Sequence, residues 1–574
     1  MEEKKKYYAY MLECADGTIY SGFTTDPERR AAVHNSGTGA RYTRSRLPVR
    51  LIYTECFDDK SSALRREAAL KKLTRREKLA LADSFEKKQK HQEADMAEVQ
   101  IRCEQGILRG ESTGGVSIFR GVPFAAPPVG PLRWRAPEKP VSWIGVRDAT
   151  RFAPAPMQLA GRLREYCFSE DCLYLNIWAP SDAPKGSCPV LVWFYGGSYM
   201  AGRSEDPAFD GSHFASMGIV TVTVNYRVGI FGFMCHPEMR GDGQRGNFGF
   251  SDQIASLEWI RDNIAAFGGD PKNVTISGQS AGSASVNNLM VSPHSRDLFQ
   301  KAINQSGDVL QPERDITFEQ ACQQGEKLQE ILECGSLDEM RDLPTSAFQT
   351  EEFDIGMQNH MGFTPVIDGY LIPRAQAEML LTNDCAQIPI MIGTCADEGS
   401  SGSGNYVERI CERFGLPRDM YPDETRETVR HLARDYWYAR HIAWIGIRAA
   451  EIGLPTWHYE YTHPTKGVGA QHGTEIPFVF GSLDKVAEAN GTEYSEEDYL
   501  FMETMSSYWA NFIKSGDPNG EGLFPWPMKT DEPVHIRLDI PCSMEADIWR
   551  PEHEAVVPPV CEWLEKRRQE ALKK

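Results

Sequence analysis

The feature that most constrains the fold is a strand-to-helix junction within residues 273–290. An apolar run of strand length, 273–277, leads into Gly278-Gln279-Ser280-Ala281-Gly282, and a helical pattern over 281–290 follows at once. The two glycines permit a tight turn that leaves the serine hydroxyl exposed. The context on both sides therefore predicts a nucleophile elbow at Ser280.

Other apolar runs of strand length, each followed by turn residues and a helical pattern, lie at 189–195, 219–225, 388–393 and 457–461. Residues 250–267 give a clear example of a helix between such strands. Strands that alternate with helices predict an α/β fold, with a mostly parallel sheet covered by helices on both faces. The sequence contains no internal repeat and no low-complexity tract.

The chain is too long for one core, because 574 residues exceed the usual size of a single domain. The segment 86–96, Glu-Lys-Lys-Gln-Lys-His-Gln-Glu-Ala-Asp-Met, has no apolar face and is expected to be a linker. Residues 1–85 then form a small domain and residues 97–574 a large one.

Charge separates the two parts of the chain. Residues 1–90 hold 20 Lys and Arg against 13 Asp and Glu, a balance of +7, so the remainder holds 42 against 68, a balance of −26. A basic module suits a phosphate backbone, although a solvated helix face explains the charge equally well. The acidic remainder argues against nucleic acid as its own ligand.

Composition excludes several classes of protein. The apolar content of 41% and the charged content of 25% are ordinary for a globular chain, and no apolar run reaches the length of a membrane helix. The start, Met-Glu-Glu-Lys-Lys-Lys, is not followed by a signal sequence, and the 14 cysteines are scattered without a CxxC pair. We expect a cytoplasmic protein with reduced thiols and no membrane partner.

A nucleophilic serine needs donors that bind the negative charge developing on the carbonyl oxygen. The run Phe-Tyr-Gly-Gly-Ser-Tyr at 194–199 ends a predicted strand upstream of Ser280. Its glycines let backbone N–H groups approach that oxygen. The expected oxyanion-hole donors are Gly197, Ser198 and Ala281.

Residues 97–574 resemble the type-B carboxylesterases, which have the α/β-hydrolase fold and are related to cholinesterases and lipases. The segments that carry the resemblance are 267–282 and 170–178, with further landmarks at 119–125 and 225–227. The resemblance implies a serine esterase that hydrolyses small-molecule carboxylic esters through an acyl-enzyme. It implies no cofactor for this reaction.

The resemblance also implies the acid and the base of a triad. Gly-Thr-Cys-Ala-Asp-Glu-Gly at 393–399 places the acid at Glu398, with Asp397 as the alternative. Gln-His-Gly-Thr-Glu-Ile-Pro at 471–477 places the base at His472, whereas His458 and His463 are expected to be packed or exposed residues. Ser280, Glu398 and His472 follow the chain order of this fold.

Two departures from the family pattern have consequences. Ser198 stands where the oxyanion loop usually has a third glycine, so its side chain is expected to crowd esters of bulky or tertiary alcohols. Secreted relatives bridge the cysteine that matches Cys172, but Met157 stands near the place of its partner and Cys167 is only five residues away. An unbridged protein is expected.

The small module has an α+β pattern. Short strands at 7–12 and 18–22 flank the turn Ala15-Asp16-Gly17, which predicts a hairpin. Asp26-Pro27-Glu28 has the residues of a helix start, and a strand at 49–55 and a helix at 61–81 follow.

This module resembles the GIY-YIG nuclease family. Tyr8-Ala9-Tyr10 and Tyr20-Ser21-Gly22 stand for its two motifs, although the first glycine and the middle isoleucine are absent. The resemblance implies metal-dependent cleavage of a phosphodiester, with DNA as the partner and Mg²⁺ as the metal. The residues that match its site are the base Tyr20, the cation Arg30, the metal ligand Glu67, and the supporting Tyr10 and His34.

Several interpretations stay open at this point. The aromatic side chains and Glu67 could be ordinary strand and helix residues, and the small module could be a binding-only relative. Nucleic-acid processing could be the main role of the chain, with the esterase incidental. The large module could also be a non-catalytic binding scaffold of the cholinesterase type, although it retains all three triad residues.

Overall fold

In the computed structural model the chain divides into two compact units, residues 1–97 and 98–574. The structure describes the chain apart from residues 1–6, 37–38, 58–59, 77, 80, 83–96, 159–166, 241–244, 308–309, 311–314, 349–362, 399–404, 452, 466–467, 530–533, 548–550 and 574. The predicted linker at 86–96 lies outside the described residues. No helix among the described residues has the length and apolarity that crossing a bilayer requires.

The small unit contains a three-stranded antiparallel sheet in the order β2-β1-β3. Its elements are β1 (Tyr7–Cys14), β2 (Ile19–Thr24), α1 (Pro27–Asn35), β3 (Val49–Phe57) and α2 (Lys60–Lys72). The predicted hairpin is present, and its turn is held by Asp16, whose carboxylate accepts the N–H of Thr18 at 3.0 Å. Asp26 caps α1 by accepting the N–H of Arg29 at 3.0 Å, as its position before Pro27 predicts.

Neighbouring residues of β1 point to opposite faces of this sheet, and one helix covers each face. Tyr10 reaches His34 of α1, whereas Met11 packs in a cluster with Leu70 of α2. The expected helix over 61–81 is too long, because α2 ends at Lys72. Residues 75–76 are helical again after Thr74, a residue type that favours the start of a helix over its interior.

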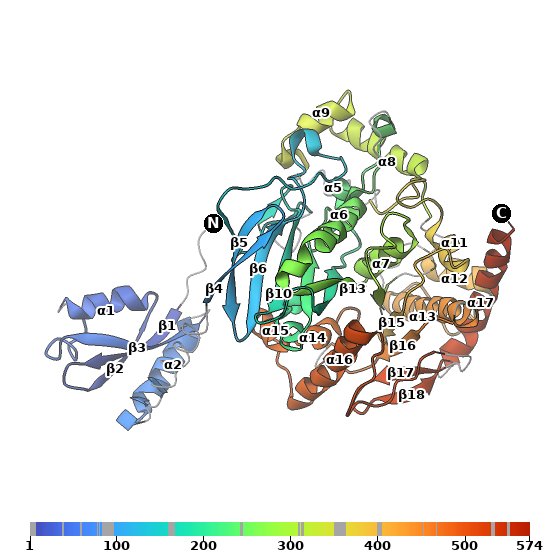
Figure 1. Ribbon diagram of the computed structural model, residues 1–574. Helices are drawn as coiled ribbons and strands as arrows, with labels where there is room; N and C mark the ends of the chain where they lie inside the picture. Colours follow the sequence, from blue (N-terminus) through green and yellow to red (C-terminus); the bar gives the residue numbers. More distant parts are fainter. Residues whose placement is uncertain are drawn as a thin grey trace. The chain divides into compact units, whose positions relative to one another are not determined.

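The large unit is built on a 13-stranded sheet in the order β18-β17-β16-β15-β14-β13-β11-β12-β10-β6-β5-β4, with β7 paired to β5 (Figure 1). Its strands are β4 (Ala97–Cys103), β5 (Gly106–Thr113), β6 (Val116–Pro123), β7 (Val146–Asp148), β10 (Tyr174–Pro180), β11 (Cys188–Phe194), β12 (Val220–Val224), β13 (Gly269–Gln279), β14 (Lys301–Gln305), β15 (Ile390–Cys395), β16 (Thr456–Tyr461), β17 (Val534–Leu538) and β18 (Ser543–Ala546). A separate pair is formed by β8 (Ala155–Pro156) and β9 (Phe168–Ser169).

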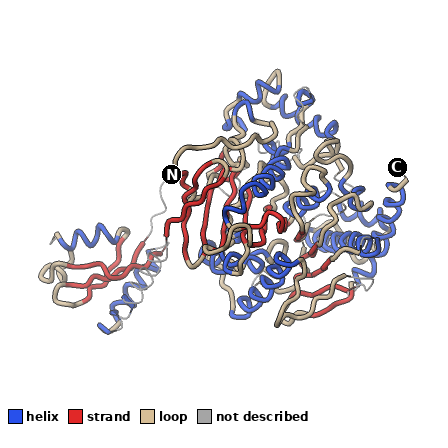
Figure 2. The backbone as a smooth tube through the Cα atoms, in the orientation of Figure 1, coloured by secondary structure: helices blue, strands red, loops and turns tan. Residues whose placement is uncertain are grey.

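Helices surround this sheet (Figure 2). They are α4 (Ser212–Ser216), α5 (Gly229–Phe233), α6 (Phe248–Asn263), α7 (Ala281–Val291), α8 (Phe318–Ile331), α9 (Leu337–Asp342), α11 (Gln376–Leu381), α12 (Tyr406–Phe414), α13 (Arg426–Glu451), α14 (Ile476–Phe480), α15 (Leu483–Asn490), α16 (Glu496–Ser515) and α17 (Pro551–Ala571). Short 3-10 turns lie at η1 (Gly130–Leu132), η2 (Pro207–Phe209), η3 (Pro237–Arg240), η4 (Ile264–Phe267) and η6 (Thr345–Phe348).

The centre of the sheet is parallel from β12 through β17, as the alternation of strands and helices predicts. Both faces are covered: Tyr459 packs on Trp509 of α16, and the preceding residue, His458, packs on Tyr438 of α13. The edges are antiparallel, through β6 and β10 on one side and β18 on the other. This architecture confirms the predicted α/β-hydrolase class and places the carboxyl ends of the parallel strands together.

Candidate active site

Ser280 occupies a strained turn between β13 and α7. Its φ of 58° and ψ of −125° lie in a region that residues with a side chain rarely adopt. The flanking glycines make the turn possible, because a Cβ on Gly278 would lie 2.4 Å from Gly282, and one on Gly282 would lie 2.0 Å from the carbonyl oxygen of Phe194. The Ser280 N–H donates to the carbonyl of Gln305 on β14 at 3.0 Å.

Glu398 and His472 form a hydrogen-bonded pair beyond the ends of β15 and β16. Oε2 of Glu398 lies 2.5 Å from Nδ1 of His472, and Oε1 accepts the N–H of Cys395 at 2.9 Å. The carboxyl group is buried, whereas the imidazole keeps 27% of its side-chain surface exposed. Burial alone would raise the pKa of Glu398, but the charge and hydrogen bond of His472 hold that pKa below its usual value. Glu398 is therefore ionised at neutral pH.

The loop that carries His472 lies against the elbow. A Cβ on Gly473 would lie 3.6 Å from the side-chain nitrogen of Gln279, the residue before Ser280. Trp437 of α13 packs edge-on against the imidazole, with ring centres 5.8 Å apart. Because Nδ1 faces the carboxylate of Glu398, Nε2 is the ring nitrogen on the other edge of the imidazole.

The glycine-rich loop after β11 turns its backbone toward the elbow. Gly197, Ser198 and Tyr199 have successive φ values of 114°, 57° and 61°, and a Cβ on Gly196 would lie 2.9 Å from Cβ of Ser280. Among the described residues, the N–H groups of Gly197, Ser198 and Ala281 find no acceptor. Three unused donors beside one serine are what an oxyanion hole requires.

Replacing Ser198 by glycine is expected to raise kcat/KM for esters of bulky alcohols. The side chain of Ser198 is exposed at the loop, and its φ of 57° is one that glycine adopts without strain. The variant keeps the backbone donor and loses only the side chain. Turnover of p-nitrophenyl acetate and of a tertiary-alcohol ester, compared between the two proteins, measures the effect; loss of bulky-ester activity in the variant would contradict it.

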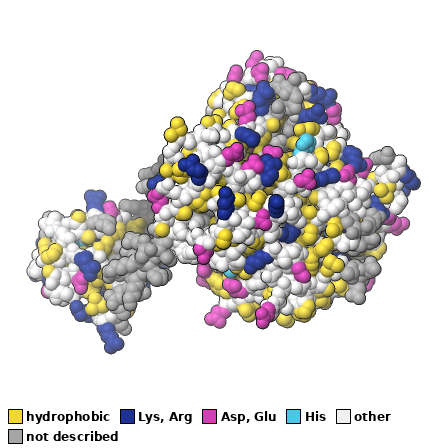
Figure 3. Space-filling view, viewed as in Figure 1, with side chains coloured by type: hydrophobic (Ala, Val, Ile, Leu, Met, Phe, Trp, Pro, Cys, Tyr) yellow, Lys and Arg dark blue, Asp and Glu magenta, His cyan; other side chains and the backbone are white. Residues whose placement is uncertain are grey.

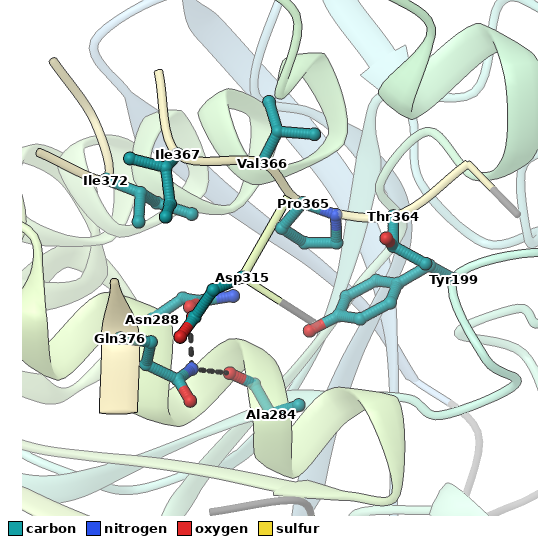
Figure 4. Close-up of a pocket in the computed structure, with 10 residues that line it drawn as sticks. All are labelled: Tyr199, Ala284, Asn288, Asp315, Thr364, Pro365, Val366, Ile367, Ile372 and Gln376. Atoms are coloured by element: carbon teal, nitrogen blue, oxygen red, sulfur yellow. Dashed lines mark hydrogen bonds between the residues drawn. The ribbon is translucent and has the colours of Figure 1, made fainter. Parts of the chain in front are cut away.

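A pocket lies beside α7, the helix that begins at the elbow, and is lined in part by Ala284 and Asn288 of that helix. Tyr199 enters it from one side, and Gln376 and Asn288 from the other (Figure 4). Gln376 donates to Oδ1 of Asn288 at 2.6 Å and to the carbonyl of Ala284, one turn into α7, at 3.4 Å. Val366, Ile367 and Ile372 add apolar surface, so the pocket suits a small molecule with both apolar and polar parts.

A second buried carboxyl group, Glu475, was not predicted from the sequence. Cys395 donates to its Oε2 at 3.2 Å, and the side chain of Gln305 contacts its Oε1 at 3.3 Å. Burial, together with the nearby charge of Glu398, raises the pKa of Glu475. Its position within the Glu-Ile-Pro sequence after His472 was the one available signal.

The other sequence landmarks have structural roles. Arg227 binds the buried carboxylate of Asp252 with two hydrogen bonds, at 2.8 and 2.7 Å. Arg133 binds Glu170 in the same bidentate way, at 2.7 and 2.6 Å. These buried pairs join Arg227 to α6 and Arg133 to the segment that carries Glu170.

Of the cysteines and histidines set aside above, Cys172, His458 and His463 are buried, whereas Cys167 is exposed. Cys172 and Met157 line one small cavity, and the cysteines of the described residues are free thiols. His463 is buried between Asp498, at 2.9 Å, and Asp539, at 3.3 Å. His458 is buried beside β17.

In the small unit, the structure brings four of the five predicted site residues together. The hydroxyl of Tyr10 lies 3.1 Å from Nε2 of His34, and the ring of Tyr20 lies 5.1 Å from that imidazole. Burial raises the pKa of Tyr10 to about 12, against a hydrogen bond from Arg30. Burial and the charge of Arg30 lower the pKa of His34, whose Nδ1 contacts Thr43 at 2.7 Å.

Glu67 is placed differently from the other four. It lies on α2 and pairs with Lys71 at 2.8 Å. Within the described part of the unit, no hydrogen bond or ion pair joins Glu67 to Tyr10, Tyr20 or His34. Basic side chains are spread over the face of this unit seen in Figure 3.

The sheet and the serine, histidine and glutamate residues at its edge define the large unit as an α/β-hydrolase. The family model "Carboxylesterase family" matches residues 96–410 and 406–547, and the chain belongs to this family. The model "GIY-YIG catalytic domain" matches residues 6–80, so the small unit is a GIY-YIG domain.

The curated relatives are ester hydrolases by name. Para-nitrobenzyl esterase of Bacillus subtilis (strain 168) is 34% identical over 479 residues, which cover 78% of this chain and 96% of the relative. Fumonisin B1 esterase of Sphingopyxis macrogoltabida is 34% identical over 459 residues, covering 74% and 83%.

Solved structures agree with these matches. A PNB esterase structure has a TM-score of 0.73 at 31% identity and covers 80% of this chain and 100% of its own. A Geobacillus stearothermophilus carboxylesterase reaches 0.68 at 32% identity, covering 79% and 99%. The protein is a carboxylic ester hydrolase that acts on small-molecule esters, which leaves no support for a non-catalytic scaffold.

Proposed function

We propose that Ser280 is the nucleophile of ester hydrolysis, His472 the general base and acid, and Glu398 the carboxylate that orients the imidazole. The contact of Glu398 with Nδ1 of His472 carries this proposal, because it leaves Nε2 to act on the serine. Oγ of Ser280 attacks the carbonyl carbon, and its proton passes to Nε2. The same proton then goes to the alkoxide, which leaves as the alcohol.

The N–H groups of Gly197, Ser198 and Ala281 stabilise the oxyanion of each tetrahedral intermediate. Water then attacks the acyl-enzyme, gives a proton to His472, and the proton returns to Ser280 as the acid departs. Every proton is carried by residues of this chain, so the mechanism requires no cofactor.

Esterase activity is expected to rise with pH through the range in which an imidazole loses its proton, roughly pH 6.5–7. Neutral His472 is the working form, and Glu398, whose pKa is lowered, is already ionised throughout this range. The measurement is kcat/KM for p-nitrophenyl acetate between pH 5 and pH 8, with the chemical step limiting. A flat profile over that interval contradicts the assignment of His472.

We propose nucleic-acid cleavage as the activity of the GIY-YIG domain, with DNA as substrate and Mg²⁺ held by Glu67. The cluster of Tyr10, Tyr20, Arg30 and His34 supports this function, because the base Tyr20 and the cation Arg30 both lie beside Tyr10. Tyr20 would activate the water, and Arg30 would stabilise the charge that develops on the phosphate.

Arg30→Ala is expected to lower Mg²⁺-dependent cutting of a labelled branched DNA by ~10²-fold or more, since it removes that charge stabilisation. Arg29→Ala is the matched control, because Arg29 is the exposed neighbour on the same helix. Glu67→Gln and EDTA should each abolish cutting and spare the esterase. An equal loss of cutting in the Arg29 and Arg30 variants would indicate that only the net positive charge of the helix matters. A wild-type protein that cuts no DNA would make this domain a binding-only relative.

We further propose that the protein works in the cytoplasm. The free thiols at the described cysteines support a reducing compartment.

A further inference from the structure

A cluster of buried polar side chains lies in the C-terminal part of the large sheet and includes none of the residues of the ester site. His458 lies on β16, His535 on β17, and Asp547 directly after β18; these strands lie side by side near α13 and α17 (Figure 1). All three side chains are buried, at 1–2% exposure.

The three side chains turn their polar atoms toward one point. Oδ1 of Asp547 lies 3.7 Å from Nδ1 of His458 and 3.5 Å from Nδ1 of His535, and one atom from each residue fits within 4.8 Å of the others. These separations exceed hydrogen-bond length. Ligands about 2.0–2.1 Å from a tetrahedral ion lie roughly 3.3–3.5 Å apart, and the two distances from Oδ1 of Asp547 are close to that spacing.

Several of these atoms lack a hydrogen-bond partner among the described residues. The atoms without a partner are both ring nitrogens of His458, Nε2 of His535 and Oδ1 of Asp547. Native proteins rarely bury polar atoms without partners, because their lost hydration is then not replaced. Nδ1 of His458 and Oδ1 of Asp547 therefore face one point without a partner, with Nδ1 of His535 beside them, and this indicates that an ion belongs there.

The surroundings leave the facing atoms of His458 and Asp547 available. Lys529 binds the other oxygen, Oδ2, of Asp547 and donates to the carbonyl of Val534 at 2.9 Å, which leaves Oδ1 directed at the histidines. Nδ1 of His535 has the hydroxyl of Tyr438 as a hydrogen-bond partner at 3.1 Å, and a bound ion would replace that hydrogen bond. Oε2 of Glu460 lies 3.9 Å from Nε2 of His535, the ring nitrogen that faces away from the cluster. In metal sites, a carboxylate at this position orients the ligating histidine.

We propose that His458, His535 and Asp547 bind a structural Zn²⁺ ion. Two imidazoles and one carboxylate are donors that zinc accepts in tetrahedral sites. The ion would join β16, β17 and the end of β18, which are held together at the sheet margin by few strand pairings. Its burial leaves no route for a substrate, so the site stabilises the fold and takes no part in ester hydrolysis.

The test measures metal in the full chain. The protein is expressed in medium with added Zn²⁺, washed with EDTA, and analysed by inductively coupled plasma mass spectrometry. We expect one zinc ion per chain in the wild type, because a buried ion exchanges slowly, and loss of that ion in Asp547→Asn and His458→Gln. The melting temperature of both variants should fall by several degrees, since an ion that binds only the folded state stabilises it.

His213→Gln is the matched control, because His213 is a partly buried histidine that contacts Ser506 in another part of the unit. This variant should keep the zinc, and Glu67→Gln should keep it as well. Growth in Co²⁺ medium should give the wild type the visible absorption of tetrahedral cobalt. This measurement tests metal binding by the wild type even if the two site variants fail to fold. A wild type without zinc or cobalt, or zinc retained in both site variants, overturns the proposal, and water then fills the cluster.

Discussion

Replacing Ser280 by alanine is expected to abolish ester hydrolysis, lowering kcat by ~10³-fold or more. Alanine removes only the hydroxyl oxygen, so the elbow and its donors stay in place. The melting temperature should therefore be unchanged. Turnover of p-nitrophenyl acetate measures the loss, and a fluorophosphonate that labels wild-type serine should leave the variant unlabelled.

Ser283→Ala provides the control for this variant, because Ser283 lies in the same helix and its hydroxyl donates to Asn304 at 3.1 Å, away from the site. Removing that buried hydrogen bond should cost about 1 kcal/mol of folding free energy and leave kcat within a few-fold of wild type. If Ser283→Ala lowers kcat as much as Ser280→Ala does, the loss reflects a damaged helix and the assignment of Ser280 fails. DNA cutting should be the same in both variants, because no proposed residue is shared between the two units.

The elbow could be predicted from the sequence because its signals are local. Two glycines around Ser280 lie between a strand pattern and a helix pattern. The bounds of α7 agree with the prediction to within one residue, whereas β13 is longer than the predicted strand at 273–277. The margins of the sheet were harder to predict, because β18 has only four residues and β4 is a largely exposed edge strand. The break of the helix after Lys72 was missed because the helical pattern continues through Thr74.

Contacts between distant residues could not be predicted in the same way. Glu475 lies beside Cys395 and Gln305, which are separated from it by 80 and 170 residues, and its raised pKa exists only because the fold buries it. The cluster of His458, His535 and Asp547 likewise forms only when β16 and β17 pair. His458 was therefore interpreted from the sequence as an ordinary packed or exposed residue.

Two residues compete for the role of triad acid, because Asp397 and Glu398 are neighbours in the sequence. The structure directs them differently: Glu398 contacts His472, whereas Asp397 lies 3.3 Å from Arg430 with 40% of its side chain exposed. Glu398→Gln is expected to lower kcat by ~10⁴-fold. Asp397→Asn should leave kcat within a few-fold of wild type, because it loses only a partly exposed ion pair.

The size of the loss expected for Glu398→Gln follows from the hydrogen bonds of the Glu398 carboxylate. Glu398 accepts from Cys395 at one oxygen and from His472 at the other. A glutamine keeps the bond from Cys395 through its carbonyl oxygen and then presents its amide NH₂ to Nδ1, which forces the proton of the imidazole onto Nε2. That tautomer cannot accept the proton of Ser280, and no negative charge remains to stabilise the imidazolium. The measurements are single-turnover rates with p-nitrophenyl acetate and melting temperatures for both variants. A large loss of rate in Asp397→Asn, with Glu398→Gln still active, would assign the acid to Asp397.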